Sequence, residues 1–410
     1  MKIKETVVPV FLGADQNCYG MARAFHAAAH CRCYAFGKMR LGATAHCPYL
    51  VFNAVPELGE KETMIRVLRE FAEKTPGKRF LFPCTDEYVQ MLAESGALLS
   101  DLYTVFAPTP EEVALLRCKD TFYRMCDLFR IPYPKTRILT LPVPHFHSDA
   151  EYPPFSYPAI LKPADGVDYF RHPFPEMEKV YTVKNKEEVY AVTDDWYKAG
   201  YRGHAVLQDL VPGPDDCIHV ITFYSDKNAK VKAVAAARVL LEEQTKKGKG
   251  NHAACLSEKP PVIARTLAAM LERIGYRGIC HFDLKFDSRD GSMRVFEINL
   301  RQGRSNLYLL AAGCNLAELI IKDYIDNETL QYKEYYRPTF WYSVPKKTVY
   351  RYTADRAAVM EARRLSREGR AISASPGLSE IWKRPLLLFY NTAHAMREEK
   401  KYRRFAVRRR

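Results

Sequence analysis

The chain opens with a pattern of apolar and polar positions that predicts alternating strands and helices. VVPVFL is an unbroken apolar run, a polar loop is expected over residues 13–19, and apolar residues then recur at helical spacing through ARAFHAAA. KRFLFPCTDEYVQMLAES repeats this order, with Thr85 and Asp86 where a helix would be capped. Residues 1–117 are therefore predicted to form a small parallel α/β domain. Its first turn, GADQNC, lacks the GxGxxG spacing of a dinucleotide site.

The pattern changes after residue 117. A helix is predicted in CKDTFYRMCDLF, ended by Pro132 and Pro134, and a proline-rich stretch leads to the strand AILKP. Strands then dominate, in the stretches HAVLQDLVPG, CIHVITFYS, VKAVAAARVLLEEQ, GICHFDLKFD and MRVFEIN. We place subdomain boundaries at 118–205 and 206–335, and treat 336–410 as a C-terminal extension.

The last two of these strands flank SRDG, a turn sequence, and are expected to form a hairpin. Side chains two positions apart share one face of a strand, so a turn centred near Asp290 places Asp283 opposite Glu297, with Asn299 on the same face. Two carboxylates and an amide suit a hard cation such as Mg²⁺. The alternative is a solvent-facing acidic strand pair, although the neighbouring positions are strongly apolar.

Two lysines stand where phosphate groups could be held. Lys162 ends the apolar strand AILKP, and Lys119 opens the helix of CKDTFYRM, whose N-terminus would add backbone donors. A lone lysine is more often an ordinary surface residue.

The segment VLQDLVPGPDDC predicts a strand that runs into a tight turn. Gln208 and backbone groups near Val211 could bind an adenine edge, leaving Asp215 or Asp216 for ribose hydroxyls. The basic, glycine-containing stretch QTKKGKGNHA could close over a triphosphate, or could be an ordinary solvated loop.

The formal charge of +14 is concentrated at the end of the chain. Residues 383–410 hold ten Lys or Arg against Glu398 and Glu399, so this tail contributes +8. Its basic and apolar residues are typical of a segment that lies on an anionic membrane surface, with a solvated tail as the alternative. Nonspecific nucleic-acid binding is a rival for the tail alone, since charge is evenly spread before residue 380 and no RNA-binding motif is present. We expect the tail to be separable from catalysis.

Targeting signals and cysteines point to the cytosol. The N-terminus lacks the pattern of a signal peptide, and no run of about 18 apolar residues predicts a membrane-spanning helix. Eleven cysteines without a CxxC pair fit reduced thiols. The expected location is cytoplasmic, with peripheral contact at the inner face of the membrane.

Taken together, the residues resemble the ATP-grasp superfamily. The order Lys119, Lys162, QDLVPG, Asp283 and FEINLR is that family's order over residues 5–330. FLGADQNCYGMARAFH, KPADGVDYFRHPF and TKKGKGNHAA look most like its D-aspartate ligase branch of carboxylate-amine ligases. The resemblance implies an α/β ATP-grasp fold after a small parallel α/β domain. PADGVDYFRHPF departs from the glycine-rich loop of many relatives, with Gly166 as its one glycine.

The resemblance also implies a function, an ATP-dependent ligase that forms a C–N bond through an acylphosphate. ATP would lie on Lys119 and Lys162, with two Mg²⁺, or Mn²⁺ as a substitute, on Asp283, Glu297 and Asn299. Arg301 is the first candidate to stabilise the transferring phosphoryl group and Arg238 the second. The candidates for binding the amino-acid or acceptor substrate are Arg304, Ser305 and Asn306.

The implied substrates are an amino acid such as D-aspartate and a lysine amine of a peptidoglycan precursor, which would make the chain an enzyme of cell-wall synthesis. The main alternative is another ATP-grasp ligase, for a dipeptide or a tailored peptide. His219, His252 and His281 are candidate bases, although structural roles are more common for such residues.

Overall fold

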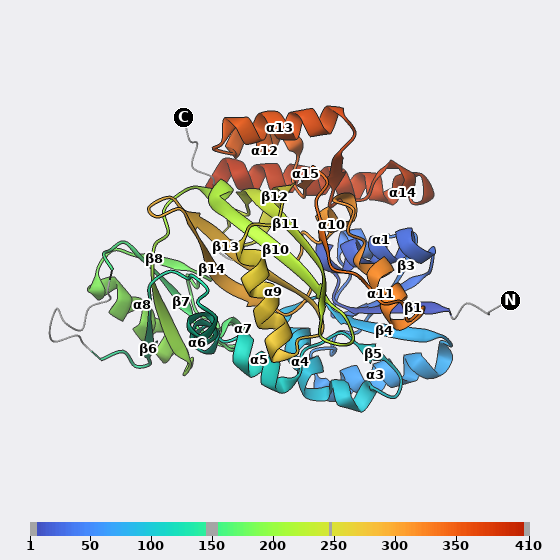
Figure 1. The fold of residues 1–410 in the computed structure, drawn as a ribbon, viewed down its shortest axis with the longest axis horizontal. Coiled ribbons are helices and arrows are strands. Elements are labelled where there is room, and N and C mark those ends of the chain that lie inside the picture. The colour runs from blue at the N-terminus through green and yellow to red at the C-terminus, as the bar shows by residue number, and fades with distance from the viewer. Residues whose placement is uncertain (1–5, 145–154, 246–247, 406–410) are drawn as a thin grey trace.

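The N-terminal unit is a five-stranded parallel sheet in the order β3-β2-β1-β4-β5 (Figure 1). The computed structural model describes residues 6–144, 155–245 and 248–405. The strands of this sheet are β1 (Val7–Leu12), β2 (Cys33–Gly37), β3 (Leu50–Ala54), β4 (Lys78–Pro83) and β5 (Thr104–Val105). The helices are α1 (Gln16–Ala29), α2 (Gly42–Ala45), α3 (Lys61–Lys74), α4 (Asp86–Ser95) and α5 (Pro110–Leu116), with a 3₁₀ turn at Gly96–Leu99. The parallel α/β domain predicted from the periodicity is confirmed.

The first helix begins earlier than the polar loop suggested. Asp15 caps α1, because its carboxylate accepts hydrogen bonds from the backbone N–H groups of Asn17 and Cys18. The loop between β1 and α1 is therefore short, and the polar residues expected in it lie in the first turn of the helix. At α4 the predicted cap is confirmed, since the Thr85 hydroxyl accepts from the N–H of Tyr88.

A four-stranded sheet in the order β6-β9-β7-β8 forms the second unit, and its recorded pairings are antiparallel. Its strands are β6 (Thr136–Thr140), β7 (Ala159–Pro163), β8 (Tyr181–Val183) and β9 (His204–Asp209), and its helices are α6 (Lys119–Phe129), α7 (Gly166–Phe170) and α8 (Lys186–Lys198). The fully buried Trp196 of α8 packs on this sheet. Since β9 pairs along its whole length, the boundary expected at residue 205 falls inside a strand.

The third and largest sheet has the order β14-β13-β10-β11-β12-β16-β17, with β15 paired to β11. Its strands are β10 (Ile218–Ser225), β11 (Val231–Glu242), β12 (His252–Glu258), β13 (Gly278–Asp287), β14 (Ser292–Asn299), β15 (Lys333–Tyr335), β16 (Phe340–Tyr342) and β17 (Ala371–Ser373). Helix α9 (Ile263–Ile274) covers one face (Figure 1). The other face packs against α1, α10 (Leu307–Ala311) and α11 (Leu316–Tyr324), which joins the N-terminal unit to this sheet.

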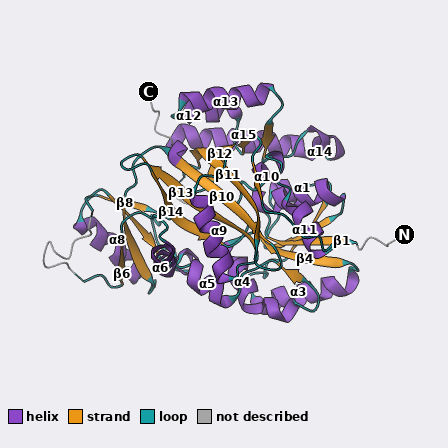
Figure 2. Ribbon diagram, in the orientation of Figure 1, coloured by secondary structure: helices purple, strands orange, loops and turns teal. Residues whose placement is uncertain are grey.

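Residues 383–405 of the C-terminal tail are part of this folded body and do not form a separate solvated segment, while the expectation that the tail is separable from catalysis stays a prediction. Helices α12 (Lys346–Tyr352), α13 (Arg356–Arg367), α14 (Leu378–Lys383) and α15 (Leu386–Phe405) lie along one edge of the molecule (Figure 2). Leu387 and Tyr402 of α15 are fully buried, and the Tyr402 hydroxyl donates to the Glu242 carbonyl at 2.6 Å. Of the helices in the described part of the chain, none is long and apolar enough to cross a bilayer.

Candidate active site

The hairpin of β13 and β14 brings together the acidic residues predicted to share one face. Asp283 pairs with Glu297, as expected, and His281 pairs with Asn299. A β-bulge follows Asp283, so that Leu284 pairs with Val295 rather than with Phe296. The Asn299 amide donates to Asp283 Oδ2 at 3.0 Å. The bulge keeps both carboxylates on the cavity side while Phe282 and Leu284 pack into the core beneath α9.

One carboxylate oxygen of this cluster lacks a hydrogen-bond partner. Asp283 Oδ1 is buried and forms no hydrogen bond. Burial, with repulsion from Glu297, raises the pKa of Asp283 to about 6. Buried anions normally require a compensating cation, and an all-oxygen set of two carboxylates and an amide matches the preference of Mg²⁺. These residues fit a hard cation, although the described residues contain no group of three or more His, Cys, Asp or Glu side chains arranged for a metal.

Two predicted lysines face this cluster from the small unit. Lys119, the first residue of α6, lies 3.2 Å from Glu297 Oε2. Lys162, at the end of β7, is buried and donates to Gln208 Oε1 at 3.0 Å. Burial, with repulsion from Lys119 and Lys179, lowers the pKa of Lys162 to about 7. Although burial opposes ionisation of Glu297, these three lysines hold its pKa below the ordinary value.

A cavity of 240 Å³ lies between the small sheet and the hairpin. Its lining combines Lys119, Lys162 and Lys249 with apolar groups such as Ile160, Val211 and Phe296. A cavity lined by apolar groups and lysines suits a flat base followed by phosphates. Lys246 and Lys247, which were expected to help close over the phosphates, lie outside the described residues.

The segment predicted to bind adenine and ribose lies only partly in this cavity. Gln208 and Val211 line it, but the Gln208 amide is occupied by Lys162, Tyr123 and Thr136. Gln208 therefore positions Lys162.

The two aspartates proposed for the ribose do not line the cavity. Asp215 accepts from the backbone N–H of Glu242, and buried Asp216 accepts from that of Asp355. Glu242, which the sequence analysis missed, does line the cavity, and burial with repulsion from Asp215 and Asp283 raises its pKa to about 8. Its carboxyl is the better ribose candidate.

A wider cavity of 510 Å³ adjoins the first and shares Lys119, Lys179, Asp283 and Glu297 with it. Residues of the short helix α7, which replaces a glycine-rich loop, line one side. Lys179 was not singled out from the sequence, because nothing in its neighbourhood distinguishes it from a surface lysine.

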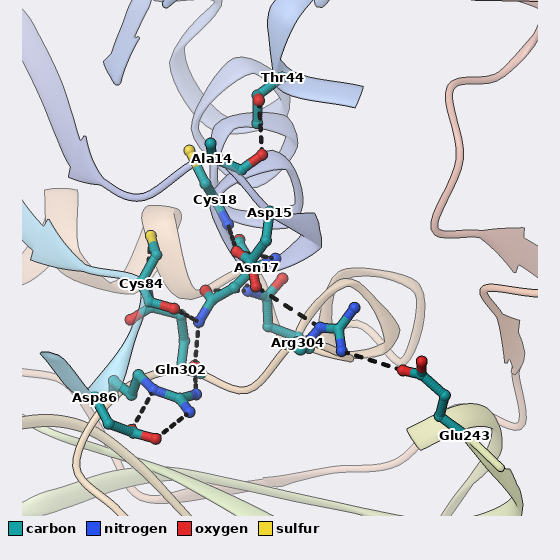
Figure 3. Close-up of polar contacts among 12 residues, drawn as sticks. Ala14, Asp15, Asn17, Cys18, Thr44, Cys84, Asp86, Glu243, Gln302 and Arg304 are labelled. Atoms are coloured by element: carbon teal, nitrogen blue, oxygen red, sulfur yellow. Dashed lines mark hydrogen bonds and ion pairs between the residues drawn. The ribbon is translucent and has the colours of Figure 1, made fainter. Parts of the chain in front are cut away.

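The arginines after β14 lie on this wider cavity. Arg301 Nε is 2.8 Å from Asp86 Oδ1, which ties the cavity wall to α4. Arg304 lies between Asp15 and Glu243, at 3.7 and 3.8 Å, as Figure 3 shows. Buried Ser305 also lines the cavity.

Asn306 does not line the described cavities. Its amide donates to the Asn17 carbonyl at 3.0 Å and to Asn17 Oδ1 at 3.1 Å. Asn17 in turn donates to the carbonyls of Cys84 and Gln302 (Figure 3). A Cβ at Gly20 would overlap the Asn306 side chain, so a glycine is needed there. Asn306 thus fastens the arginine loop to α1 rather than contacting a substrate.

Arg238 is not brought to the site. It pairs with His219, and His219 pairs with Leu284, which places all three on the face opposite Asp283. Its guanidinium donates to the Asp216 carbonyl at 2.6 Å and to Asp355 at 2.8 Å. Arg238 therefore connects β11 to α13, away from the cavities.

The three histidines have different surroundings. His219 pairs with Glu258 at 2.6 Å on the far face. His252 and His281 flank Asp283, with Nε2–Oδ distances of 3.5 and 3.9 Å. Burial lowers the pKa of His252 to about 4, so this ring is neutral at pH 7.

Comparisons with known proteins identify relatives of the whole chain. No protein-family model matches it. The chain is 31% identical over 376 residues to a D-aspartate ligase of Enterococcus faecium (strain Aus0004), with 89% of each chain covered. The crystal structure of an L-amino acid ligase from Bacillus licheniformis matches with a TM-score of 0.53 and 14% identity, over 78% of this chain and 75% of that one.

A second solved structure is the biotin carboxylase domain of the Hydrogenobacter thermophilus 2-oxoglutarate carboxylase, in complex with MgADP and bicarbonate. It matches with a TM-score of 0.59 and 14% identity, over 81% of this chain and 73% of that one. At this identity such likenesses bear on the fold alone. The α/β ATP-grasp fold with a preceding parallel α/β domain, expected from the motifs, is confirmed.

Proposed function

The chain belongs to the D-aspartate ligase family of ATP-grasp carboxylate-amine ligases, and we propose from this premise that it joins an amino acid to an amine at the cost of ATP. It is an ATP-dependent ligase that forms C–N bonds. The relative's name supports D-aspartate as the acid, and a lysine amine of a peptidoglycan precursor is the proposed acceptor.

The observation that carries this proposal is the buried Asp283 Oδ1, which forms no hydrogen bond and lies beside Glu297, faced by Lys119 and Lys162. Acids on one side and lysines on the other are what a triphosphate with a divalent cation requires. Two Mg²⁺ would be held by Asp283, Glu297 and Asn299, and would neutralise charge on the phosphates.

The residues of the chain then have distinct tasks. Lys162, held by Gln208, and Lys119 bind the phosphates, while the 240 Å³ cavity holds the base. The substrate carboxylate attacks the γ-phosphorus, ADP departs, and the amine nitrogen displaces phosphate from the acyl carbon as it loses a proton to water. Arg301, fixed by Asp86, is placed to stabilise the charge of the transferring group.

The test is ADP release by the purified protein with Mg²⁺ and ATP. A panel of D- and L-amino acids is supplied with and without a soluble lysine-containing peptidoglycan precursor. Release that requires both D-aspartate and this acceptor supports the proposal. Release with another acid or amine replaces the substrates and keeps the ligase, whereas no release with any pair rejects the proposed activity.

We also infer that the protein meets its acceptor at an anionic membrane surface. The outer side of α14 and α15 exposes large apolar side chains, with Trp382 85%, Phe389 73%, Met396 68% and Leu386 64% exposed. Exposed lysines and arginines lie close to them in the sequence, among them Lys383, Arg384, Lys400 and Arg404. Apolar anchors within a basic surface match anionic lipid headgroups, at about 1 kcal/mol for each basic residue.

This contact can be measured with the protein's own tryptophan. Trp196 and Trp341 are fully buried, so a blue shift of fluorescence on adding vesicles reports Trp382. We expect the shift, and sedimentation with the vesicles, with phosphatidylglycerol and not with phosphatidylcholine. Equal behaviour with both lipids, or a shift that persists in Trp382→Ser, would reject this contact.

A further inference from the structure

Helix α15 buries Leu387, but the rest of its inner side carries polar groups, whereas Leu386, Phe389 and Met396 are exposed. Tyr390, His394, Glu398 and Tyr402 recur every four residues on its inner side, and Glu398 is only 6% exposed. A helix that packs on a core normally buries an apolar stripe. The polar groups on this side of α15 require polar surroundings beneath the helix.

Beneath it lies a third cavity, with a volume of 300 Å³, whose outer wall is α15. The N-terminal unit supplies Asp15, Gln16 and residues 40–42. Glu243, which directly follows β11, and His252 of β12 also line the cavity. We call this cavity the α15 chamber. A Cβ at Gly42 would overlap the Tyr390 ring, so the helix lies tightly on the N-terminal unit.

The α15 chamber adjoins the proposed reaction centre. Arg304 and His252 line both this chamber and the 510 Å³ cavity, and His252 also lines the 240 Å³ cavity. Because His252 Nε2 is 3.5 Å from Asp283 Oδ1, a molecule in the chamber can extend one group toward the acidic cluster. The three cavities therefore meet at His252. The proposed reaction has three substrates, namely ATP, the amino acid and the amine acceptor.

Acidic and basic side chains alternate along the wall of the chamber. Asp15 and Glu243 flank Arg304 at 3.7 and 3.8 Å (Figure 3), and Lys401 lies 3.2 Å from Glu243 and 2.9 Å from Glu398. Both contacts of Arg304 are too long for hydrogen bonds, and its buried Nε has no hydrogen-bond partner. This guanidinium therefore keeps donors for a carboxylate, while two carboxylates beside it can accept from an ammonium group.

These charges discriminate among the three substrates. Carboxylates at Asp15, Glu243 and Glu398 repel phosphate, which has its lysines in the other cavity. A lysine side chain of the acceptor offers an ammonium but no carboxylate next to it. An α-amino acid offers both signs a few ångströms apart, and 300 Å³ is at the small end of ligand pockets.

We propose that the α15 chamber binds the zwitterionic head of the amino-acid substrate. Arg304 holds its α-carboxylate, Asp15 and Glu243 hold its α-ammonium group, and its reacting carboxylate passes His252 toward the acidic cluster. Lys401 is a positioning residue that keeps Glu243 in place from α15. This assignment rests on the proposed function for the choice of an amino acid as substrate.

Calorimetry on the full chain, with Mg²⁺ and a non-hydrolysable ATP analogue, tests the assignment with D-aspartate as the probe. We expect Glu243→Gln and Lys401→Met to weaken its binding about tenfold or more, since a charged partner is lost. Lys401→Arg should restore most of the affinity. Arg403→Met is the matched control, because it removes an exposed ion pair with Glu399 from the same helix and should bind as the parent does.

Steady-state kinetics then separates the outcomes. The KM for the amino acid should rise in Glu243→Gln and Lys401→Met while the KM values for ATP and acceptor stay within twofold. A rise in the acceptor KM instead, unchanged binding in both variants, or no saturable binding of any amino acid by the parent protein would overturn the assignment. If the expected binding pattern appears without ADP release, the chamber stands and the proposed ligase activity fails.

Discussion

Replacing Glu297 with glutamine removes one negative charge from the acidic cluster without changing the volume of the side chain. Glu297 lies opposite Asp283 and 3.2 Å from the Lys119 ammonium, with side chains 28% and 13% exposed. The substitution removes the negative charge that attracts Lys119, Lys162 and Lys179. It also removes repulsion from Asp283, so the pKa of Asp283 should fall from about 6.

The expected magnitudes differ for stability and catalysis. At 3.2 Å the Coulomb attraction to Lys119 is about 5 kcal/mol for an effective dielectric constant of about 20, but desolvation offsets most of it. The net loss of unfolding free energy should be about 1–3 kcal/mol, which leaves a cooperative fold. Loss of a preorganised charge at the transferring phosphoryl group should lower kcat by about 10²–10³.

The assay combines ADP release with thermal unfolding, each recorded with and without MgCl₂. The parent protein should be stabilised by Mg²⁺, whereas Glu297→Gln should unfold cooperatively without that stabilisation. Asp290→Asn, in the turn of the same hairpin, removes an exposed charge and should behave as the parent does. Full ADP release by Glu297→Gln, or unchanged stabilisation by Mg²⁺, would refute the assignment of this cluster.

Four further predictions concern residues in the site, beside it and away from it. Gln208→Ala removes a hydrogen-bond partner of Lys162. Since a hydrogen bond to a charged group is lost, the dissociation constant for ATP should rise about tenfold. An unchanged ATP affinity in calorimetry would contradict this prediction. Lys162 has a pKa of about 7, and a bound phosphate favours its charged form. The ATP dissociation constant should therefore rise as pH increases from 7 to 9. Lys162→Arg should make that rise smaller, because arginine stays charged over this range. Deleting residues 386–410 uncovers Glu242 and the large sheet, so we expect a lower unfolding temperature and no turnover; normal turnover would show that α15 is dispensable. Arg238→Met should lower stability and leave the KM values unchanged, because its partners lie away from the cavities.

Much of the fold and part of the site could be predicted from the pattern of the chain. The strands that carry Lys162, Asp283 and Glu297 lie where the apolar runs placed them, because a buried strand must be apolar whatever its partners. The pairing of Asp283 with Glu297 was also predicted, although the turn alone does not account for it. From the turn up to Lys285 the register places Phe296 opposite Asp283, and the bulge shifts Glu297 into that position.

Other residues were misplaced because their environment is distant in the sequence. Arg238 lies in a strand whose apolar pattern fits either face of the sheet. Its pairing with His219 places it on the face opposite Asp283. Asp215 and Asp216 follow the proposed adenine strand closely, but their carboxylates bind backbone N–H groups of Glu242 and Asp355 instead. The local sequence does not distinguish an aspartate that binds a ribose from one that binds backbone N–H groups.

The sequence by itself determined the strands, the hairpin and the chemistry of its acidic face, because those depend on residues within a few positions of one another. Only the tertiary structure decided that Arg301 meets Asp86 across 215 positions, and that Tyr402 meets Glu242 across 160. It also decided that α15, whose composition predicts a separate basic tail, forms the wall of a cavity. The periodicity of apolar residues indicates how much of an element is buried, whereas packing over the whole chain determines which element covers it.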